Sequence, residues 1–374
     1  MQFIDLHAQY QALQQEIDEN IRRVLEHGKY IMGPEVGELE EKLAAYVGRR
    51  HCITCANGTD ALSLVLMAWG IGPGDAVFVP SFTFMSTAEV VSLAGAEPVF
   101  VDVEEDTFNM DPESLAEAIA RVDREGRLRK RAVIPVDLFG LPADYRRILP
   151  IAEAHGLKVL EDGAQGFGGT LDGKTACAFG DASTTSFFPA KPLGCYGDGG
   201  AVFTDDDTLA GLLQSIRIHG KGSEKYDNVR VGLNSRLDTL QAAILQPKLA
   251  AFSAYELAAR QKWAEAYSER LSGAVKTPAV PEGFSSSWAQ YTLLLENHAK
   301  RESLKAALAA AGVPSMVYYP RPLHRQTVYL PLGYEAGSLP VSERLAERVL
   351  SLPMHPYLTE ETVEAVCAAV LKNL

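Results

Sequence analysis

Short apolar runs with the length of β-strands alternate with helical patterns through the first two thirds of the chain, and this alternation limits the fold more than any other feature. In the helical stretches, apolar residues recur every three or four positions. Such a rhythm predicts an α/β fold, with a mostly parallel sheet covered by helices on both faces. The predicted strands are 76–80, 98–103, 132–139, 158–161, 183–188 and 201–204, and the helices between them include 86–94, one opened by Asp111-Pro112, and 143–155.

The pattern changes from about Arg236 onward. A long helical stretch runs through 241–251 and 257–271, and shorter strand-like and helical segments follow it to the C-terminus. A chain of 374 residues also exceeds the usual size of one domain. We therefore expect a large domain over residues 1–245 and a smaller α+β domain over residues 246–374.

A lone lysine, Lys191, lies in the glycine- and proline-rich turn that follows the strand-like run 183–188. A lysine amine becomes a nucleophile when its surroundings lower its pKa, and it then forms Schiff bases with carbonyl compounds or with pyridoxal phosphate. Most lysines are simply exposed surface charges. The case for a catalytic Lys191 therefore depends on two segments upstream.

These upstream segments offer a carboxylate and a phosphate site. The run 158–161 ends in Asp162, and ligands of open α/β sheets lie beyond the carboxyl ends of strands. A carboxylate there can keep the pyridinium nitrogen of pyridoxal phosphate protonated; a turn or cap residue is the alternative. Gly58 and Thr59 stand between the apolar run 52–55 and a helical pattern, where N–H groups and the helix dipole favour phosphate. The alternative there is a helix capped by Thr59.

In this order, the three segments resemble the DegT-type (DegT/DnrJ/StrS) family of sugar-nucleotide aminotransferases, which are pyridoxal-phosphate enzymes of fold type I. The resemblance runs nearly end to end. It implies that residues 1–245 bind pyridoxal phosphate and that the enzyme moves an amino group from L-glutamate to the keto sugar of a nucleotide-sugar. The matching motifs are Phe3-Ile-Asp-Leu, Gly33-Pro-Glu-Val, Asn57-Gly-Thr-Asp-Ala61, Pro80-Ser-Phe-Thr-Phe84, Glu161-Asp, Ser186-Phe-Phe-Pro-Ala-Lys191, Gly197-Asp-Gly-Gly200 and Asn234-Ser-Arg-Leu-Asp238.

The resemblance also implies roles for individual residues at the cofactor. Lys191 is expected to form the Schiff base and to shuttle a proton as general base and acid, while Asp162 binds the ring nitrogen. Phe84 matches an aromatic residue stacked on the cofactor ring; a core phenylalanine is the alternative. The other expected cofactor contacts are Gly58 and Thr59, Gln165 near the ring hydroxyl, Ser186 at the phosphate, and Asn234, which reaches the phosphate of the neighbouring subunit in a homodimer.

At the substrate end the chain looks closest to one branch of the family. That branch aminates C3 of UDP-2-acetamido-2-deoxy-3-oxo-glucuronate, on the way to diacetamido uronic acids of surface polysaccharides. The resemblance lies in the stretches 186–200, 232–242 and 351–357. Amination of a 3-keto or 4-keto deoxy sugar nucleotide is the alternative.

The expected substrate contacts are Arg236, Tyr318, Tyr319 and His324. In the uronate branch an arginine and a His-Tyr pair hold the sugar carboxylate; Arg236 and Tyr319 match, and Tyr318 stands where the histidine is expected. The guanidinium of Arg236 can bind a carboxylate or a phosphate through paired hydrogen bonds. The alternative for Arg236 is a structural salt bridge. His324 and also His219 are candidates for sugar contacts, and for both a structural role is the alternative.

Composition excludes several other classes. The formal net charge of −13 argues against general nucleic-acid or membrane binding, and no apolar run approaches the length of a membrane span. The N-terminus has no signal-peptide pattern, and five scattered cysteines fit a reducing cytoplasm. Cys52-Ile-Thr-Cys55 lacks a second pair for zinc, so we interpret it as core packing and expect no metal. The basic run 127–131, flanked by acidic residues, is interpreted as a solvated connector.

Three rival functions are weighed against an aminotransferase. A pyridoxal-phosphate sugar dehydratase shares the family, but its branch carries histidine in place of the lysine, and Lys191 is present. An NAD-dependent dehydrogenase needs Gly-x-Gly-x-x-Gly after its first strand, and the glycines at 70–74 and 194–200 do not fit. A regulatory protein without enzyme activity should lack the lysine, the aspartate or the phosphate loop. All three are present, so the sequence predicts an aminotransferase.

Overall fold

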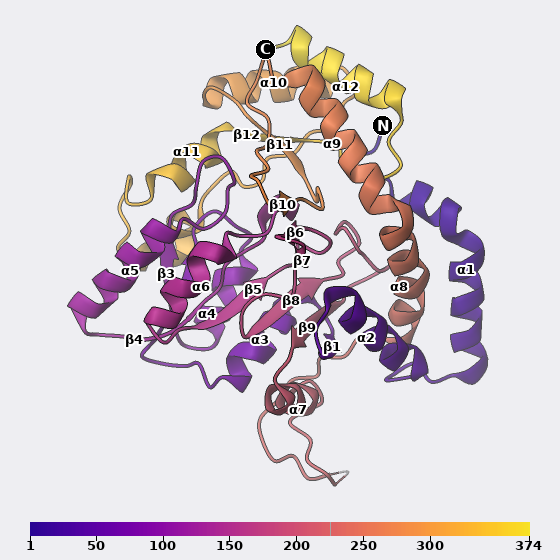
Figure 1. Ribbon diagram of the computed structural model, residues 1–374, viewed down its shortest axis with the longest axis vertical. Helices are drawn as coiled ribbons and strands as arrows, with labels where there is room; N and C mark the ends of the chain where they lie inside the picture. The colour runs from indigo at the N-terminus through magenta and orange to yellow at the C-terminus, as the bar shows by residue number, and fades with distance from the viewer. Residues whose placement is uncertain (225) are drawn as a thin grey trace.

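The computed structural model describes residues 1–224 and 226–374. Its centre is a seven-stranded sheet in the order β1-β9-β8-β5-β4-β2-β3, in which β9 runs antiparallel to both neighbours and the other pairs are parallel (Figure 1). The predicted mostly parallel sheet is confirmed. The strands are β1 (His51–Cys55), β2 (Asp75–Pro80), β3 (Glu97–Val101), β4 (Arg129–Val133), β5 (Lys158–Asp162), β8 (Ala182–Ser186) and β9 (Gly200–Thr204).

Helices cover both faces of this sheet because side chains of a strand point alternately to either side. Val77 and Val79 of β2 belong to the core under α3, α4 and α7, whereas Ala76 and Phe78 belong to the core under α5 and α6. Helices α2 and α8 cover β1 and β9 on the second face. The helices are α2 (Pro34–Val47), α3 (Gly58–Ala68), α4 (Ser86–Leu93), α5 (Pro112–Glu125), α6 (Tyr145–Ala154), α7 (Asp207–Ile216) and α8 (Thr239–Ala251).

The C-terminal part has its own core. It is built on the antiparallel pair β11 (Tyr291–Leu294) and β12 (Val349–Leu352). The predicted boundary at 245/246 falls inside α8, which continues through the π-turn Phe252–Glu256 into α9 (Leu257–Leu271) and so joins the two parts. The other elements are α1 (Leu6–His27), which lies along α8, β6 (Thr170–Leu171), β7 (Lys174–Thr175), β10 (Phe284–Ser285), α10 (His298–Ala310), α11 (Pro340–Arg348) and α12 (Glu360–Lys372) (Figure 1).

One predicted strand is shorter than expected, and the difference shapes the site. The strand expected over 132–139 ends at Val133, since Pro135 has no N–H for a continued ladder. The chain then turns as a 3₁₀ segment, Leu138–Gly140, in which Phe139 has a left-handed φ of 59°. The residues between the strand and this turn therefore lie beyond the carboxyl edge of the sheet.

Two sequence motifs to which we assigned no catalytic or metal-binding role can be located in the fold. Cys52 and Cys55 are buried free thiols of β1, as expected for core packing. The expected connector 127–131 is only partly correct, because residues 127 and 128 precede β4 whereas residues 129–131 belong to it. The run is paired with acidic residues: Arg127 with Glu97, Lys130 with Asp123, and Arg129 with Asp75. Among the described residues, no helix combines the length and the apolar character needed to cross a membrane.

Candidate active site

Asp162 is the last residue of β5, and its carboxylate is buried at the carboxyl edge of the sheet. Thr87 Oγ1 donates to Asp162 Oδ2 at 2.8 Å, and the N–H of Ala164 donates to Oδ1 at 3.2 Å. Burial raises the pKa of Asp162, whereas the two hydrogen bonds and the nearby charge of Lys191 act in the opposite direction. The carboxylate is therefore held in one orientation and has the amine of Lys191 as its neighbour.

Lys191 lies in the turn after β8, on the neighbouring strand of the sheet, with its side chain partly buried. Its N–H donates to the carbonyl oxygen of Phe188 at 2.9 Å, which shapes the turn. Burial lowers the pKa of the Lys191 amine, and the charge of Asp162 partly opposes this effect. A lowered pKa makes the neutral, nucleophilic amine more available, as Schiff-base chemistry requires.

The N-terminus of α3 forms a compact cradle beside β8. Asn57 caps the helix by accepting from the N–H of Asp60 at 2.7 Å, so the alternative of a Thr59 cap is wrong. The N–H groups of Gly58 and Thr59 stand in the first turn, where a helix supplies no partner of its own. A Cβ added to Gly58 would lie 2.7 Å from Cβ of Ser186, so the chain approaches Ser186 as closely as only glycine permits. Backbone N–H groups and a serine hydroxyl at a helix N-terminus fit a phosphate group.

The close approach gives a direct test of the cradle. Gly58→Ala should weaken pyridoxal-phosphate binding about tenfold or more and cost about 1–3 kcal/mol of stability, because the methyl group pushes α3 away from Ser186. Titration of the apoprotein with pyridoxal phosphate measures the first effect, and thermal unfolding measures the second. Gly37→Ala in α2 is the matched control, since a Cβ there meets nothing within 4 Å. Equal cofactor affinity of the two variants would contradict the cradle.

Gln165 is buried, and its side-chain amide is fixed at both ends. The N–H of Phe139 donates to Gln165 Oε1 at 2.9 Å, and Gln165 Nε2 donates to the hydroxyl of Tyr319 at 3.2 Å. Phe84 exposes 54% of its surface, and its ring centroid lies 6.2 Å from that of Tyr319. An exposed aromatic beside a fixed amide is available to stack on a planar ring, so the alternative of a core phenylalanine does not describe Phe84.

Asn234 and Arg236 form a second group near the cradle. The Arg236 guanidinium donates to Asn234 Oδ1, and Asn234 is exposed. Ser235 between them is buried and accepts from the N–H of Ala56, just before α3. The segment is therefore anchored to the entrance of the cradle, and both polar side chains remain at the surface.

The remaining substrate candidates differ in how exposed their side chains are. Tyr318 is half-buried next to Tyr319, with its ring against that of Phe3. His324 is 0% exposed; Nδ1 pairs with Ser81 Oγ at 2.6 Å and Nε2 with Glu343 Oε1 at 3.0 Å. Its place favours the structural alternative over a sugar contact. His219 is exposed, in the loop that follows α7.

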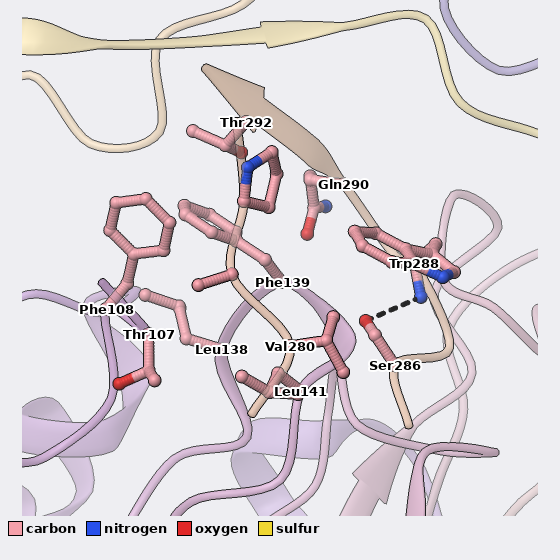
Figure 2. Close-up of a pocket in the computed structure, with 12 residues that line it drawn as sticks. Thr107, Phe108, Leu138, Phe139, Leu141, Val280, Ser286, Trp288, Gln290 and Thr292 are labelled. Atoms are coloured by element: carbon pink, nitrogen blue, oxygen red, sulfur yellow. Dashed lines mark hydrogen bonds between the residues drawn. The ribbon is translucent and has the colours of Figure 1, made fainter. Parts of the chain in front are cut away.

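A narrow apolar slot lies between the turn 138–141 and the segment 278–292 (Figure 2), and its lining residue Phe139 donates its N–H to Gln165. Phe108, Phe139 and Trp288 line it, and all three have a left-handed φ. Its volume of about 20 Å³ holds one water molecule, not a cofactor or a sugar. The slot therefore supports the back of the site and does not bind the reactants.

Thr87 is the residue that the sequence did not single out. It lies in α4, one turn after the motif that ends at Phe84, and it orients Asp162. No motif marks it, because its role depends on α4 packing beside the end of β5. The threonine among apolar neighbours in 86–94 was the one available signal.

Known proteins share this arrangement over the whole chain. A crystal structure of a DegT/DnrJ/EryC1/StrS aminotransferase from Brucella abortus has a TM-score of 0.95 and 55% identity, covering 99% of this chain and 98% of that one. UDP-2-acetamido-2-deoxy-3-oxo-D-glucuronate aminotransferase of Pseudomonas aeruginosa is 49% identical, with 99% of each chain covered. A protein of Geobacillus stearothermophilus named pleiotropic regulatory protein is 43% identical, over 97% of this chain and 95% of its own.

The fold and the site together define a fold-type I, pyridoxal-phosphate-dependent aminotransferase. The model of the DegT/DnrJ/EryC1/StrS aminotransferase family matches residues 11–371, and the chain belongs to this family. The predicted family, fold class and cofactor are confirmed.

Proposed function

We propose that this enzyme transfers the amino group of L-glutamate to C3 of UDP-2-acetamido-2-deoxy-3-oxo-glucuronate, for amino-sugar biosynthesis that supplies surface polysaccharide such as O-antigen. The observation that carries the chemistry is the neighbouring pair Lys191 and Asp162 at the carboxyl edge of the sheet. The full-length similarity to the Pseudomonas aeruginosa enzyme supports the sugar. The second candidate is a 3-keto or 4-keto deoxy sugar nucleotide.

Pyridoxal phosphate supplies an electron sink that makes the C–H bond next to the transferred amine acidic. Asp162 would bind the ring nitrogen and keep it protonated, while Gly58, Thr59 and Ser186 would bind the phosphate. Lys191 Nζ would hold the cofactor until an amino donor takes its place, and the free amine would then take up and return the proton of the acidic C–H bond. In the net reaction L-glutamate leaves as 2-oxoglutarate, and the amino group replaces the carbonyl oxygen of the keto sugar.

Two further side chains would position the ring of the cofactor. Phe84 would cover one face of the ring and exclude water from it, and Gln165 would direct an N–H toward the ring hydroxyl. The fixed amide of Gln165 supports this role, because Phe139 and Tyr319 leave it one orientation. These assignments follow the family resemblance and the geometry together.

At the substrate end we propose that Arg236 binds the sugar carboxylate, with Tyr318 and Tyr319 lining the sugar. Arg236 is partly exposed and donates to Asn234, a neutral side chain, and it forms no ion pair with the residues that the structure describes. A guanidinium in this state can pair with an incoming anion. Burial raises the pKa of Tyr318, so its phenol is neutral and donates a hydrogen bond where the related branch has histidine.

We further propose a cytoplasmic homodimer with shared active sites. Large apolar side chains are exposed beside the segments of the site: Tyr30 and Ile31 lie next to Asp238 and Thr239, and Phe188 lies in the turn before Lys191. Exposed apolar groups gathered in one region indicate a protein interface, and a second copy would bring its Asn234 to the cradle. All five cysteines are free thiols, as in a reducing compartment.

Visible absorbance of the holoenzyme tests the function. Pyridoxal phosphate should give a yellow band that fades with L-glutamate as 2-oxoglutarate forms, and the correct keto sugar should restore it. Arg236→Ala should raise KM about 10- to 100-fold for the uronate and leave KM for a keto sugar without a carboxylate unchanged. Arg124→Ala, an exposed arginine of α5, is the control.

Each part of the proposal can fail separately. If pyridoxal phosphate gives no band, the regulatory function suggested by the name of the Geobacillus relative replaces the enzyme. If Arg236→Ala affects both sugars equally, the carboxylate assignment is wrong, and the deoxy sugar becomes the preferred substrate.

A further inference from the structure

Behind Asp162 the structure buries two more carboxyl groups that have no part in the mechanism above. Glu161 precedes Asp162 in β5 and points to the opposite side of the sheet, and Asp137 lies in the segment after β4. Both are 0% exposed. Uncompensated buried carboxylates are costly, so each of these groups needs a partner or a proton.

Backbone groups satisfy most of the oxygens of the pair. Glu161 Oε1 and Oε2 accept from the N–H groups of Cys177 and Phe179 at 2.5 and 2.7 Å. Asp137 Oδ1 accepts from the N–H of Ala143 at 3.0 Å and from the hydroxyl of Tyr145 at 2.8 Å. In the described part of the chain, no conventional donor reaches Asp137 Oδ2.

Glu161 and Asp137 are neighbours in the fold, and each carboxyl group acts on the pKa of the other. Two ionised carboxylates cannot hydrogen-bond to each other, since neither has a hydrogen to donate. A proton on one of the two acids would let it donate to the other, and it would also satisfy Asp137 Oδ2, the buried oxygen that lacks a donor.

Asp137 also holds the segment that carries the cofactor contacts. Its N–H donates to the carbonyl oxygen of Asp162 at 3.0 Å. Its carboxyl group fills the space beside Gly166, where an added Cβ would lie 2.5 Å from Asp137 Oδ2. The two ends of the segment 162–166 thus rest on one residue, and Asp162 and Gln165 both project from that segment.

We propose that Asp137 and Glu161 share one proton and act as a positioning pair, which holds the segment 162–166 so that Asp162 and Gln165 face the cofactor. This inference rests on the cofactor contacts proposed above. Sharing the proton leaves the pair with a single negative charge. A second charge, directly behind Asp162, would repel its carboxylate and distort the segment.

The pKa directions agree with a shared proton. Burial raises the pKa of both acids, that of Asp137 to about 6. The other titratable groups that face the pair are Asp162, Tyr145 of α6, Cys177 and, near Glu161, Lys174 of β7. Tyr145 and Cys177 are held neutral by raised pKa values, so they add no charge of their own.

Infrared spectroscopy of the wild-type protein and of Asp137→Asn and Glu161→Gln tests the sharing. The wild type should show at neutral pH the carbonyl band of a protonated carboxyl group. Both single variants should lose it, because the remaining acid ionises without its partner. Glu153→Gln, an exposed acid of α6, should retain the band. A band that persists in either variant shows a proton on one acid alone and overturns the sharing.

Stability against pH gives a second readout of the same proton. The folded wild type binds a proton that the unfolded chain releases above about pH 4. Its stability therefore falls as pH rises through that window, up to the raised pKa values. Relative to wild type, the unfolding constant of each variant should fall by up to about tenfold per pH unit across the window. If the ratio of the unfolding constants of variant and wild type does not change with pH, the proposal is contradicted. If Asp137→Asn does not fold, the result for Glu161→Gln decides.

Cofactor affinity tests the positioning role. Both variants should bind pyridoxal phosphate about tenfold more weakly than wild type, as residues behind a binding shell commonly do when replaced. Unchanged affinity, with the infrared band lost, would overturn the positioning role. If the wild type itself forms no visible band, the proposed function fails, and the infrared result still decides the sharing.

Discussion

Lys191→Ala should lower kcat by about 10⁴-fold or more, because it removes both the amine that binds the cofactor and the base that moves the proton. Noncovalent binding of pyridoxal phosphate should persist, since Gly58, Thr59 and Ser186 still hold the phosphate. The measurement is the rate of 2-oxoglutarate release from L-glutamate, with visible spectra of the same samples. Lys372→Ala, an exposed lysine of α12, is the control for loss of a lysine charge. Full activity of Lys191→Ala would end the assignment.

The same variant also tests whether subunits share active sites. Asn234→Ala alone should bind the cofactor weakly at both sites of a dimer. A mixed dimer of one Lys191→Ala chain and one Asn234→Ala chain has one site with both native residues, if Asn234 acts on the neighbouring subunit. Mixing the two variants should therefore restore activity at low cofactor concentration. Activity no higher than the average of the unmixed variants would place Asn234 outside the neighbour's site.

Asp162→Asn should lower kcat about 10²- to 10³-fold while the protein stays folded. Asparagine keeps the shape and still accepts from Thr87, but it leaves the ring nitrogen without a buried counter-charge. The change also removes the charge that raises the pKa of Lys191, so the pKa of that amine should fall further. Steady-state rates and the pH dependence of cofactor binding measure the two effects.

A surface aspartate provides the comparison for this variant. Asp106→Asn removes an exposed carboxylate that pairs with Lys276 at the surface, where such a pair contributes little. It should match the wild type in rate. If Asp162→Asn is also within tenfold of wild type, Asp162 does not hold the ring nitrogen.

The sequence predicted the sheet because strand and helix periodicities are local properties of the chain. It also proposed Lys191, Asp162 and Gly58 as candidates, and the structure places all three on or next to strand ends, where short motifs hold them. The supporting residues were not predictable in this way. Thr87 and Asp137 act through contacts made only after α4 and the segment after β4 pack beside β5.

The fold departs from the expected strand at one position and favours the structural alternative at another, for related reasons. Phe139 continues an apolar run, so periodicity extended the strand, but Pro135 and the left-handed turn redirect the chain toward Gln165. His324 has the chemistry of a sugar contact, yet Ser81 and Glu343 occupy both of its nitrogens inside the fold. Side-chain chemistry alone does not reveal which way a residue faces.

The hydrogen bond between Gln165 and Tyr319 assigns the docking of the C-terminal part to one tyrosine and leaves the proposed contact with the sugar to its neighbour. Tyr319 belongs to the C-terminal part, and its hydroxyl is docked on the cofactor end of the large domain. The hydroxyl of the adjacent Tyr318 takes no part in that bond. If Tyr318 lines the sugar, as proposed, the residue at 318 can change to suit a new sugar while Tyr319 keeps the loop in register, so acceptor preference can be adjusted without rebuilding the cofactor end of the site.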